Sequence, residues 1–150
     1  MTDAGYFEDI EEGTEIDCGR LEVEQSEMVE FAERYDPQPV HVDPEAAAES
    51  MYDGLIASGW LTCALTMRLL VTGFLNETQV IAARGVDDLR WHLPVYAGDE
   101  LTVDAEILEK YAGDDPTFGH AKAAIRTTNG NGHEVLTMTG LVIVEKRGGG

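Results

Sequence analysis

The sequence has little positive charge. Of its 150 residues, 10 are Lys or Arg and 29 are Asp or Glu, which gives a formal net charge of −19. A negative surplus of this size repels nucleic acids and anionic membranes, so we expect neither as a partner. Only three of the ten basic residues are lysines. This carboxylate-rich, lysine-poor composition indicates a protein adapted to a cytoplasm of high salt concentration. The alternative is an ordinary acidic protein of an organism that lives at low salt.

Cysteine is also scarce, and the two that are present, Cys18 and Cys63, make neither a disulfide framework nor a metal motif. Cys63 lies in an apolar segment and is predicted to be a buried, inert thiol. The four histidines lack the spacing of known metal motifs, so we expect no metal. If a metal ion were bound nevertheless, the candidate ligands would be His41 and Asp43 together with His92, His120 or His133.

Long apolar runs, repeats and linkers are absent. The most apolar segment, 54–74, carries Arg68 and several hydroxyls, whereas a membrane span needs about 20 clean apolar residues. The acidic start, 1–17, does not resemble a signal peptide. We therefore expect a cytoplasmic protein with one domain over residues 1–147 and a flexible end at 148–150. No glycine-rich phosphate loop is present, and we expect no cofactor.

Apolar periodicity and capping residues predict three helices. The first covers about 26–35, with Ser26 as its N-cap. The second begins after Asp43, an N-cap followed by proline. The third is long and buried, from about 58 to 72, with Gly73 as its C-cap.

Five segments favour β-strands. They are 14–25, 79–92 (with a break near Gly85), 101–107, 118–128 and 133–145. Asn-Gly-Asn-Gly joins the last two and is a strong hairpin signal. The segment "PVYAGDE" (94–100) is predicted to be a turn between strands. One apolar helix combined with an antiparallel sheet indicates an α+β fold, with the sheet wrapped around the helix.

Asp36 and His41 lie five residues apart in "DPQPVH", a proline-rich loop between two predicted helices. Neither helix requires these two side chains for its own structure. A carboxylate and an imidazole held close together can polarise one water molecule between them. The prolines would reduce the cost of ordering both side chains. The alternative is an aspartate that ends a helix and a histidine that packs against the next one.

The segment "GLIASGW" (54–60) offers a second kind of chemistry. If the long helix starts at Ser58, its first N–H groups have no partner within the helix, and the helix dipole favours negative charge there. The Gly59 N–H could then polarise a carbonyl and stabilise a developing enolate oxygen. The alternative is an ordinary serine cap followed by a small residue that allows tight packing.

Three blocks carry a family resemblance: "FAERYDPQPVHVDPEAA" (31–47), "SMYDGLIASGW" (50–60) and "LRWHLPVYAGDELTV" (89–103). In this order and spacing they resemble the MaoC-like dehydratase family, which includes the (R)-specific enoyl-CoA hydratases. The resemblance implies a hotdog fold, a long central helix wrapped by a curved antiparallel sheet. It also implies a homodimer or an assembly of dimers.

The resemblance assigns roles to the site residues. In the family an Asp and a His, spaced as Asp36 and His41 are, activate the water that adds reversibly to a trans-2-enoyl thioester, such as an acyl-CoA. A glycine at the start of the central helix, here Gly59, donates its N–H to the thioester carbonyl. These three are the expected catalytic residues. The expected substrate-binding residues are Ser58, Gly54 and Gln38.

Two departures from the family concern the substrate. The family usually has Asn at the position of Gln38 and often His at that of Ser58. A hotdog thioesterase and a non-catalytic acyl-CoA-binding domain are the alternative functions, although thioesterases lack the D-x-x-P-x-H block. The candidate residues for contacts with the phosphates of coenzyme A are Arg68, Arg84, Arg90, Lys110 and Lys122, and the sequence does not choose among them.

Overall fold

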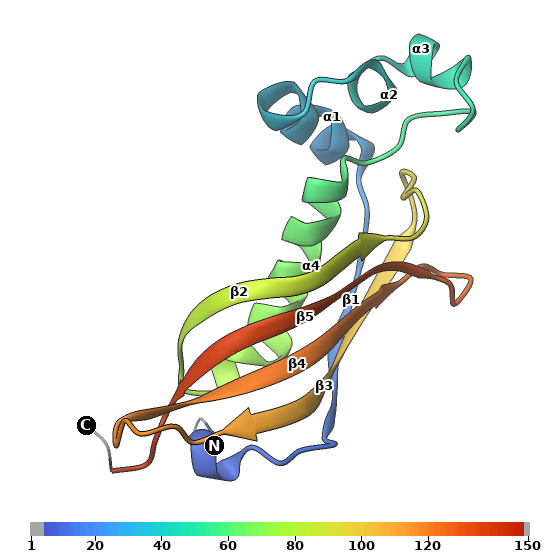
Figure 1. Cartoon of the computed structure of the whole chain (residues 1–150). Coiled ribbons are helices and arrows are strands. Elements are labelled where there is room, and N and C mark those ends of the chain that lie inside the picture. Colours follow the sequence, from blue (N-terminus) through green and yellow to red (C-terminus); the bar gives the residue numbers. More distant parts are fainter. Residues whose placement is uncertain (1–4, 149–150) are drawn as a thin grey trace.

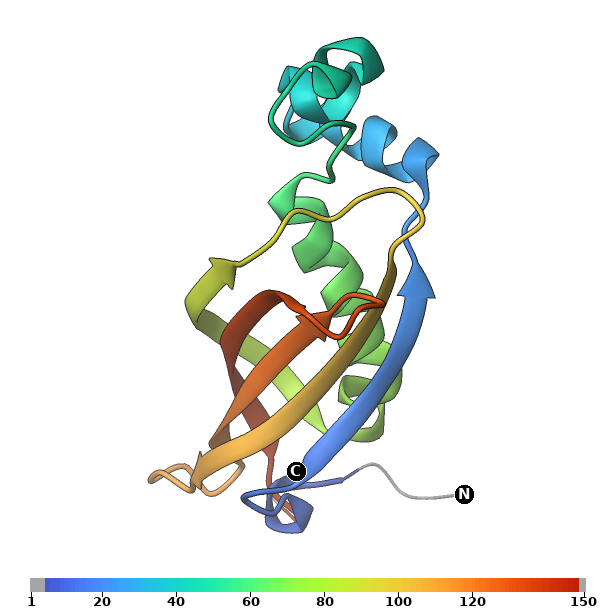
Figure 2. The ribbon, with the colours of Figure 1, turned by 90° about the vertical axis from the view of Figure 1, so that its right-hand side faces the viewer.

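A five-stranded antiparallel sheet curves around one long helix in the computed structural model, which describes residues 5–148 (Figure 1). Seen from the side, the helix lies along one face of the sheet and the strands bend around it (Figure 2). The predicted α+β class and hotdog arrangement are confirmed. Residues 149–150 of the predicted flexible end lie outside the described residues.

All five predicted strands are present, and their order in the sheet is β1-β3-β4-β5-β2. β1 and β2 are therefore the two edges. The strands are β1 (Glu15–Glu22), β2 (Val80–Trp91), β3 (Glu100–Tyr111), β4 (Phe118–Thr128) and β5 (Glu134–Glu145). The predicted hairpin joins β4 to β5, and the Gly132 N–H donates to the Asn129 carbonyl at 2.9 Å.

The predicted break in β2 near Gly85 is instead a change of register within one continuous strand. The pairing with β5 shifts between Ala83 and Gly85, and again at two other places. An extra residue opposite a partner bends a strand and increases its twist. The glycine therefore helps the sheet curve around the helix without ending the strand.

Three short helices form a separate group beyond the end of the sheet, which we call the head. They are α1 (Gln25–Tyr35), α2 (Pro39–Val42) and α3 (Pro44–Ala48). The prediction that Ser26 caps α1 is wrong: Glu24 holds the cap position with an extended backbone, and Ser26 already lies inside the helix. The predicted cap of α3 is confirmed, since the Asp43 carboxylate accepts the N–H groups of Glu45 and Ala46.

The long helix α4 (Gly59–Gly73) begins where predicted, after the N-cap Ser58. Gly73 is its last helical residue, and Phe74 is the C-cap, so the predicted role of Gly73 is wrong. Its small size has another reason, because a Cβ there would lie 2.6 Å from the Cα of Cys18 in β1. Short 3-10 turns at Phe7–Asp9 and Leu75–Glu77 complete the chain.

The core lies between α4 and the concave face of the sheet. Inward residues of β3 and β4 such as Val103, Ile107 and Ile125 pack with Leu69 and Leu70 of α4. A second cluster continues the core into the head, where Met28, Ala47 and Leu55 pack with Leu61 and Leu65. The start of α4 is thus fixed by packing on both sides.

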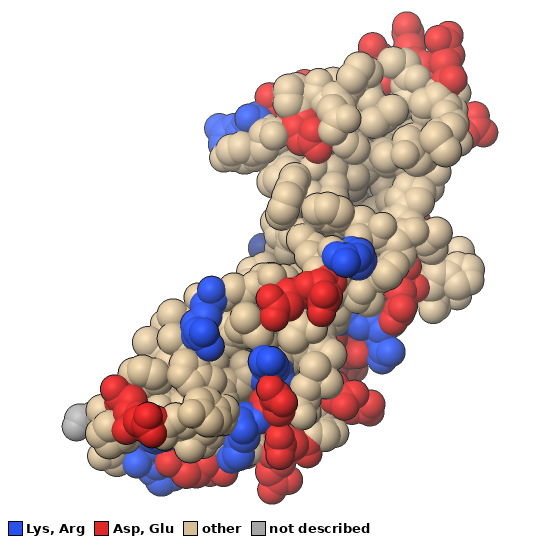
Figure 3. Space-filling model, in the orientation of Figure 1, with Lys and Arg blue, Asp and Glu red and all other residues tan. Residues whose placement is uncertain are grey.

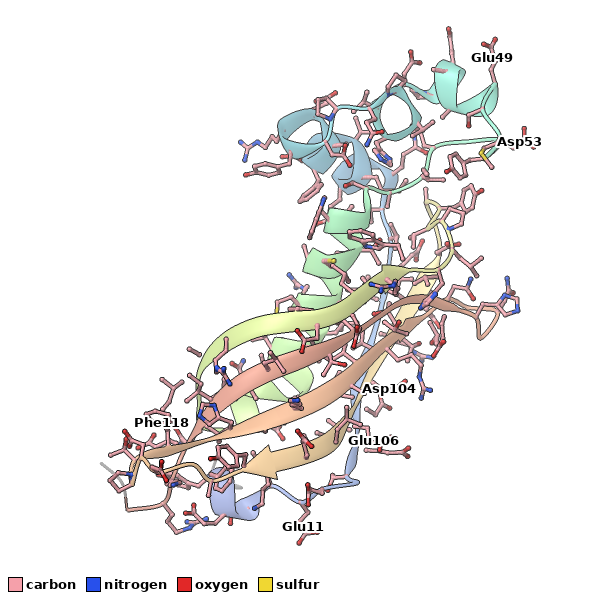
Figure 4. The ribbon with its side chains drawn as sticks, viewed as in Figure 1. Glu11, Glu49, Asp53, Asp104, Glu106 and Phe118 are labelled. Carbon is pink, nitrogen blue, oxygen red and sulfur yellow. The ribbon has the colours of Figure 1, made fainter. Side chains whose placement is uncertain are left out.

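Acidic side chains gather at two ends of the molecule. Carboxylates cover the tip of the head and the lower sheet body, and a waist with few charges separates them (Figure 3). Glu49 and Asp53 lie at the tip, whereas Asp104 and Glu106 lie on the sheet (Figure 4). Among the described residues, no helix is long and apolar enough to cross a membrane.

Candidate active site

The head brings Asp36 and His41 to the start of α4. Asp36 closes α1, where its N–H donates to the Ala32 carbonyl at 2.8 Å. The expected loop up to His41 is partly helical, because Pro39 starts the one-turn helix α2, in which His41 lies. Proline fits the first turn of a helix, since its ring fixes φ near the helical value. The turn points His41 back toward Asp36.

Asp36 is held as an ionised carboxylate by two donors. Gln38 Nε2 donates to Oδ1 at 2.7 Å, and Ser58 Oγ donates to Oδ2 at 2.7 Å. The Gln38 amide first, and the Ser58 hydroxyl second, hold the pKa of Asp36 below its usual value. Hydrogen bonds to the charged form of a carboxylate favour that form.

His41 is buried, and its ring is oriented by a backbone carbonyl. Its Nδ1 lies 2.8 Å from the Ile56 oxygen, while its Nε2 lies 3.4 Å from Asp36 Oδ2. A carbonyl only accepts, so Nδ1 must carry the proton. In the neutral ring, Nε2 then presents a lone pair toward Asp36.

The turn at 94–100 holds the segment that carries the Ile56 carbonyl in place. Ile56 pairs with Tyr96 in an isolated antiparallel bridge, and the Ala57 N–H donates to the Val95 carbonyl at 2.8 Å. Tyr96 also donates its hydroxyl to the Tyr52 carbonyl at 2.9 Å. The turn acts on the site indirectly, by holding the segment that orients His41.

Gly59 is the first residue of α4, and the described residues supply no acceptor for its N–H. Ser58 accepts the next N–H, that of Trp60, while donating its own hydroxyl to Asp36. A Cβ at Gly59 would lie 2.6 Å from the ring of Trp91. The same ring donates its Nε1–H to the Gly59 carbonyl at 2.8 Å. Only glycine allows this contact.

A cavity of about 330 Å³ opens between these residues and the end of β2. Its lining residues are His41, Tyr52, Ile56, Ala57, Gly59, Thr62 and the segment 91–95. The walls combine apolar side chains such as Ile56 and Val95 with the polar groups of Thr62 and His92, and such mixed walls can both hold and orient a small ligand. Such a cavity suits an acyl chain whose reactive end lies near His41 and Gly59.

The structure brings together five of the six predicted site residues. Asp36, His41, Gly59, Ser58 and Gln38 form one connected group. Gly54 does not join them: its N–H donates to the Ala47 carbonyl at 3.1 Å, and it does not line the cavity. Its structural role is in the turn after α3.

Trp91 and Thr62 are site residues that the sequence reasoning missed. Both line the cavity, and Trp91 covers the start of α4. The available signals were the Trp-His pair inside the block 89–103 and the position of Thr62 one helical turn after Gly59. Neither signal identifies a site before the fold is known.

Other reactive groups lie apart from this site or are held inactive. Burial raises the pKa of the Cys18 thiol to about 11 and also raises that of Cys63, so neither favours the thiolate. His92 is the exception, because it lines the cavity, where its Nε2 lies 2.7 Å from Thr137 Oγ1; His120 lies far from the cavity, beside Arg84. Residues 5–148 contain no group of three potential metal ligands.

The chain belongs to the MaoC-like domain family, because the family's sequence model, described as "MaoC like domain", matches residues 10–128. Among curated proteins it is 34% identical over 106 residues to a 3-hydroxybutyryl-CoA dehydratase of Methylorubrum extorquens, covering 69% of this chain and 64% of that protein. It is 34% identical over 90 residues to the uncharacterized YdeM of Bacillus subtilis, covering 60% and 64%. The chain therefore spans just under two thirds of each relative.

Solved structures show the same fold. A MaoC-like dehydratase from Rhodospirillum rubrum is 39% identical, with a TM-score of 0.87, covering 95% of this chain and 97% of that chain. An (R)-hydratase from A. caviae is 28% identical, with a TM-score of 0.71, covering 89% and 96%. The family and the hotdog fold expected from the three sequence blocks are thus confirmed.

Proposed function

We propose that the chain is an (R)-specific enoyl-CoA hydratase, a hydro-lyase that adds water reversibly to trans-2-enoyl thioesters of coenzyme A. The observation that carries the proposal is the 3.4 Å approach of His41 Nε2 to Asp36 Oδ2 beside the N-terminus of α4. Similarity to a 3-hydroxybutyryl-CoA dehydratase and to an (R)-hydratase supports it. The salt-adapted, cytoplasmic setting inferred from composition is part of the same proposal.

The pair is arranged to hold one water by both of its hydrogens. We propose that His41 acts as the tautomer fixed by the Ile56 carbonyl, with its Nε2 lone pair toward the Asp36 carboxylate, so that two acceptors face each other and no hydrogen bond joins them directly. A water molecule can donate one hydrogen to each acceptor. Its oxygen lone pairs then remain free to attack the β-carbon of a substrate in the cavity.

The chemical step balances within this group. As the water oxygen bonds to the β-carbon, one water proton passes to the Asp36–His41 pair, and the electrons of the double bond move toward the thioester oxygen. The Gly59 N–H stabilises that enolate oxygen, helped by the α4 dipole. The pair then returns a proton to the α-carbon, on the face from which the water came, which gives syn addition. Dehydration is the reverse.

Ser58 and Gln38 act by positioning Asp36. Each donates one hydrogen bond at 2.7 Å to a different carboxylate oxygen. We therefore propose that both influence the substrate through the orientation of Asp36, in place of the direct substrate contact expected from the sequence. The acyl group itself would be bound by the apolar side chains of the cavity wall near Ile56 and Pro94.

The test uses crotonyl-CoA in molar potassium chloride, with loss of the enoyl absorbance as the readout and a thiol reagent in parallel wells. Loss of absorbance without thiol release, and a 3-hydroxybutyryl product of R configuration, is the expected result. Thiol release would identify a thioesterase. Thermal stabilisation by acyl-CoA without turnover would identify a binding domain, and either result would contradict the proposal.

We further propose that the chain forms a homodimer, or an assembly of dimers, through the edge strand β2. An unpaired edge strand offers its backbone to a second strand. β2 exposes Ile81, Val86 and Trp91, and Trp60 of α4 contacts Trp91 edge-on. A light-scattering mass at an even multiple of 16.4 kDa is expected, and 16.4 kDa itself would contradict the proposal.

A further inference from the structure

A second cavity near the active site has a different chemistry. It is a cleft of about 390 Å³ between α1 and α4. Phe31, Arg34 and Tyr35 line it from the head, and Leu61 and Arg68 line it from α4. The surface is drawn in where the head meets the sheet body, which is the waist of the molecule (Figure 3). We call this the α1/α4 cleft.

The cleft holds two arginines that the described part of the chain leaves without a partner. Arg34 and Arg68 are exposed and make neither an ion pair nor a side-chain hydrogen bond there. Most other cations are engaged. Lys110 donates to the Phe7 carbonyl, Lys122 pairs with Glu109, Lys146 donates to the Asp115 carbonyl, and Arg126 pairs with Asp104.

The α1/α4 cleft has no net charge, although the chain as a whole is strongly negative. Arg34 is the only Lys or Arg between Arg20 and Arg68 in the sequence. Glu27 and Glu30 line the same cleft, so its four charges cancel, in a chain of net charge −19. Glu27 lies about 10 Å before Arg34 along α1, and Glu30 lies one helical turn before it, but neither forms an ion pair with Arg34 among the described residues, so its guanidinium stays available to an anion.

The cleft and the active-site cavity lie on opposite sides of the first turns of α4. Gly59 and Thr62 face the cavity, whereas Leu61 and Arg68 face the cleft. The Gly59 N–H at the helix end lies between the two. Arg68 follows Gly59 by nine residues, a rise of about 14 Å. An extended pantetheine arm can cover this span.

We propose that the α1/α4 cleft binds the phosphates of coenzyme A, with Arg34 and Arg68 as the residues that select a nucleotide thioester over a pantetheine thioester. The assignment rests on the proposed function. With the acyl chain in the cavity and the thioester at Gly59, the arm passes over the start of α4 into the cleft. Arginine matches phosphate with two parallel hydrogen bonds, and the diphosphate and the ribose phosphate offer two separate targets.

The experiment compares Arg34→Gln and Arg68→Gln with Arg84→Gln, each removing one positive charge. Arg84 is the matched control, because it lines a different cavity on the outer face of the sheet with Lys122 and His120. With crotonyl-CoA at constant salt, each cleft variant should raise KM about 10-fold at unchanged kcat, as expected for one lost charge-assisted hydrogen bond. With crotonyl-pantetheine, all three variants should match the wild type.

Equal KM values for the cleft variants and the wild type, or an equal loss with crotonyl-pantetheine, would overturn the assignment. A raised KM in the Arg84→Gln variant alone would also overturn it. Calorimetric titration with free coenzyme A tests binding at the cleft independently of the proposed hydratase reaction. If crotonyl-CoA is not turned over but both cleft variants weaken coenzyme A binding about 10-fold, the assignment of the cleft is supported and the proposed hydratase activity is refuted. No binding to the wild type, or unchanged binding in the variants, refutes the cleft.

Discussion

Replacing Gly59 by Ala tests how the start of α4 is built. The new Cβ would lie 2.6 Å from Trp91 Cε2 and 2.7 Å from Nε1, whereas carbon atoms in contact are about 3.5–4.0 Å apart. The ring must therefore move by about 1 Å. This breaks its 2.8 Å hydrogen bond to the Gly59 carbonyl and disturbs its edge contact with Trp60.

The stability change is the sum of small opposing contributions. The lost hydrogen bond costs about 1 kcal/mol and the lost aromatic contact about 1 kcal/mol. Alanine is about 1 kcal/mol better than glycine inside a helix, which offsets one of them. The expected net loss is about 1 kcal/mol, or about 3 °C in Tm for a chain of this length. Activity should fall by more, about 100-fold, because the N–H donor and the cavity wall both move.

The assay is a double-mutant cycle with Trp91→Ala, using calorimetric Tm and the rate of crotonyl-CoA hydration. Without the ring, Gly59→Ala should be neutral or slightly stabilising and should cost less than about 10-fold in rate. Gly130→Ala is the control, since its Cβ would meet nothing within 4 Å. An equal effect of Gly59→Ala in both backgrounds, or no effect in the wild type, would refute the steric argument.

Three further predictions concern the support of the site and the core. Ser58→Ala removes the hydroxyl that donates to Asp36 and caps α4. It should lower the free energy of unfolding in urea by about 1–2 kcal/mol and kcat about 10-fold. Ser58→Thr retains the hydroxyl and should keep both the hydrogen bond to Asp36 and the cap. Because its pKa is lowered in the folded state, Asp36 adds stability above its unfolded pKa of about 3.9 and loses it as the pH falls through the folded value. The stability difference between wild type and Asp36→Asn should therefore shrink as the pH falls below about 4, and a constant difference would contradict the lowered pKa. Thr66→Val leaves the buried Thr127 hydroxyl unpaired and should cost about 1–3 kcal/mol, with partial recovery in the double valine variant.

The strands and the central helix were predictable because their patterns are local. Alternation along 101–107 and the Asn-Gly-Asn-Gly hairpin define antiparallel strands, and Ser58 with its apolar run defines a buried helix. The errors lie at helix ends. Ser26 and Gly73 have the residue types of caps, but Glu24 and Phe74 hold those positions. Gly73 is small because of Cys18 in β1, a contact 55 residues away that no local pattern carries.

The candidate site was predictable in its residues and not in its geometry. The motif supplied Asp36 and His41, but their distance depends on α2, on the Ile56 carbonyl and on the 94–100 turn that holds it. Trp91 comes from the end of β2, and only the curvature of the sheet brings it over Gly59. The salt adaptation, the cytoplasmic location and the single-domain organisation over 1–147 stay predictions.

The role of Asp36 is the central claim, and its most direct test is the rate of crotonyl-CoA hydration by Asp36→Asn beside Asp43→Asn. Both variants exchange one carboxylate for an amide of the same shape, and Asp43 caps α3, where Asn serves as well as Asp. Asp36→Asn should lose about 10³- to 10⁴-fold in kcat with an intact fold, while Asp43→Asn should keep the wild-type rate. An Asp36→Asn variant within about 10-fold of the wild type would contradict the account.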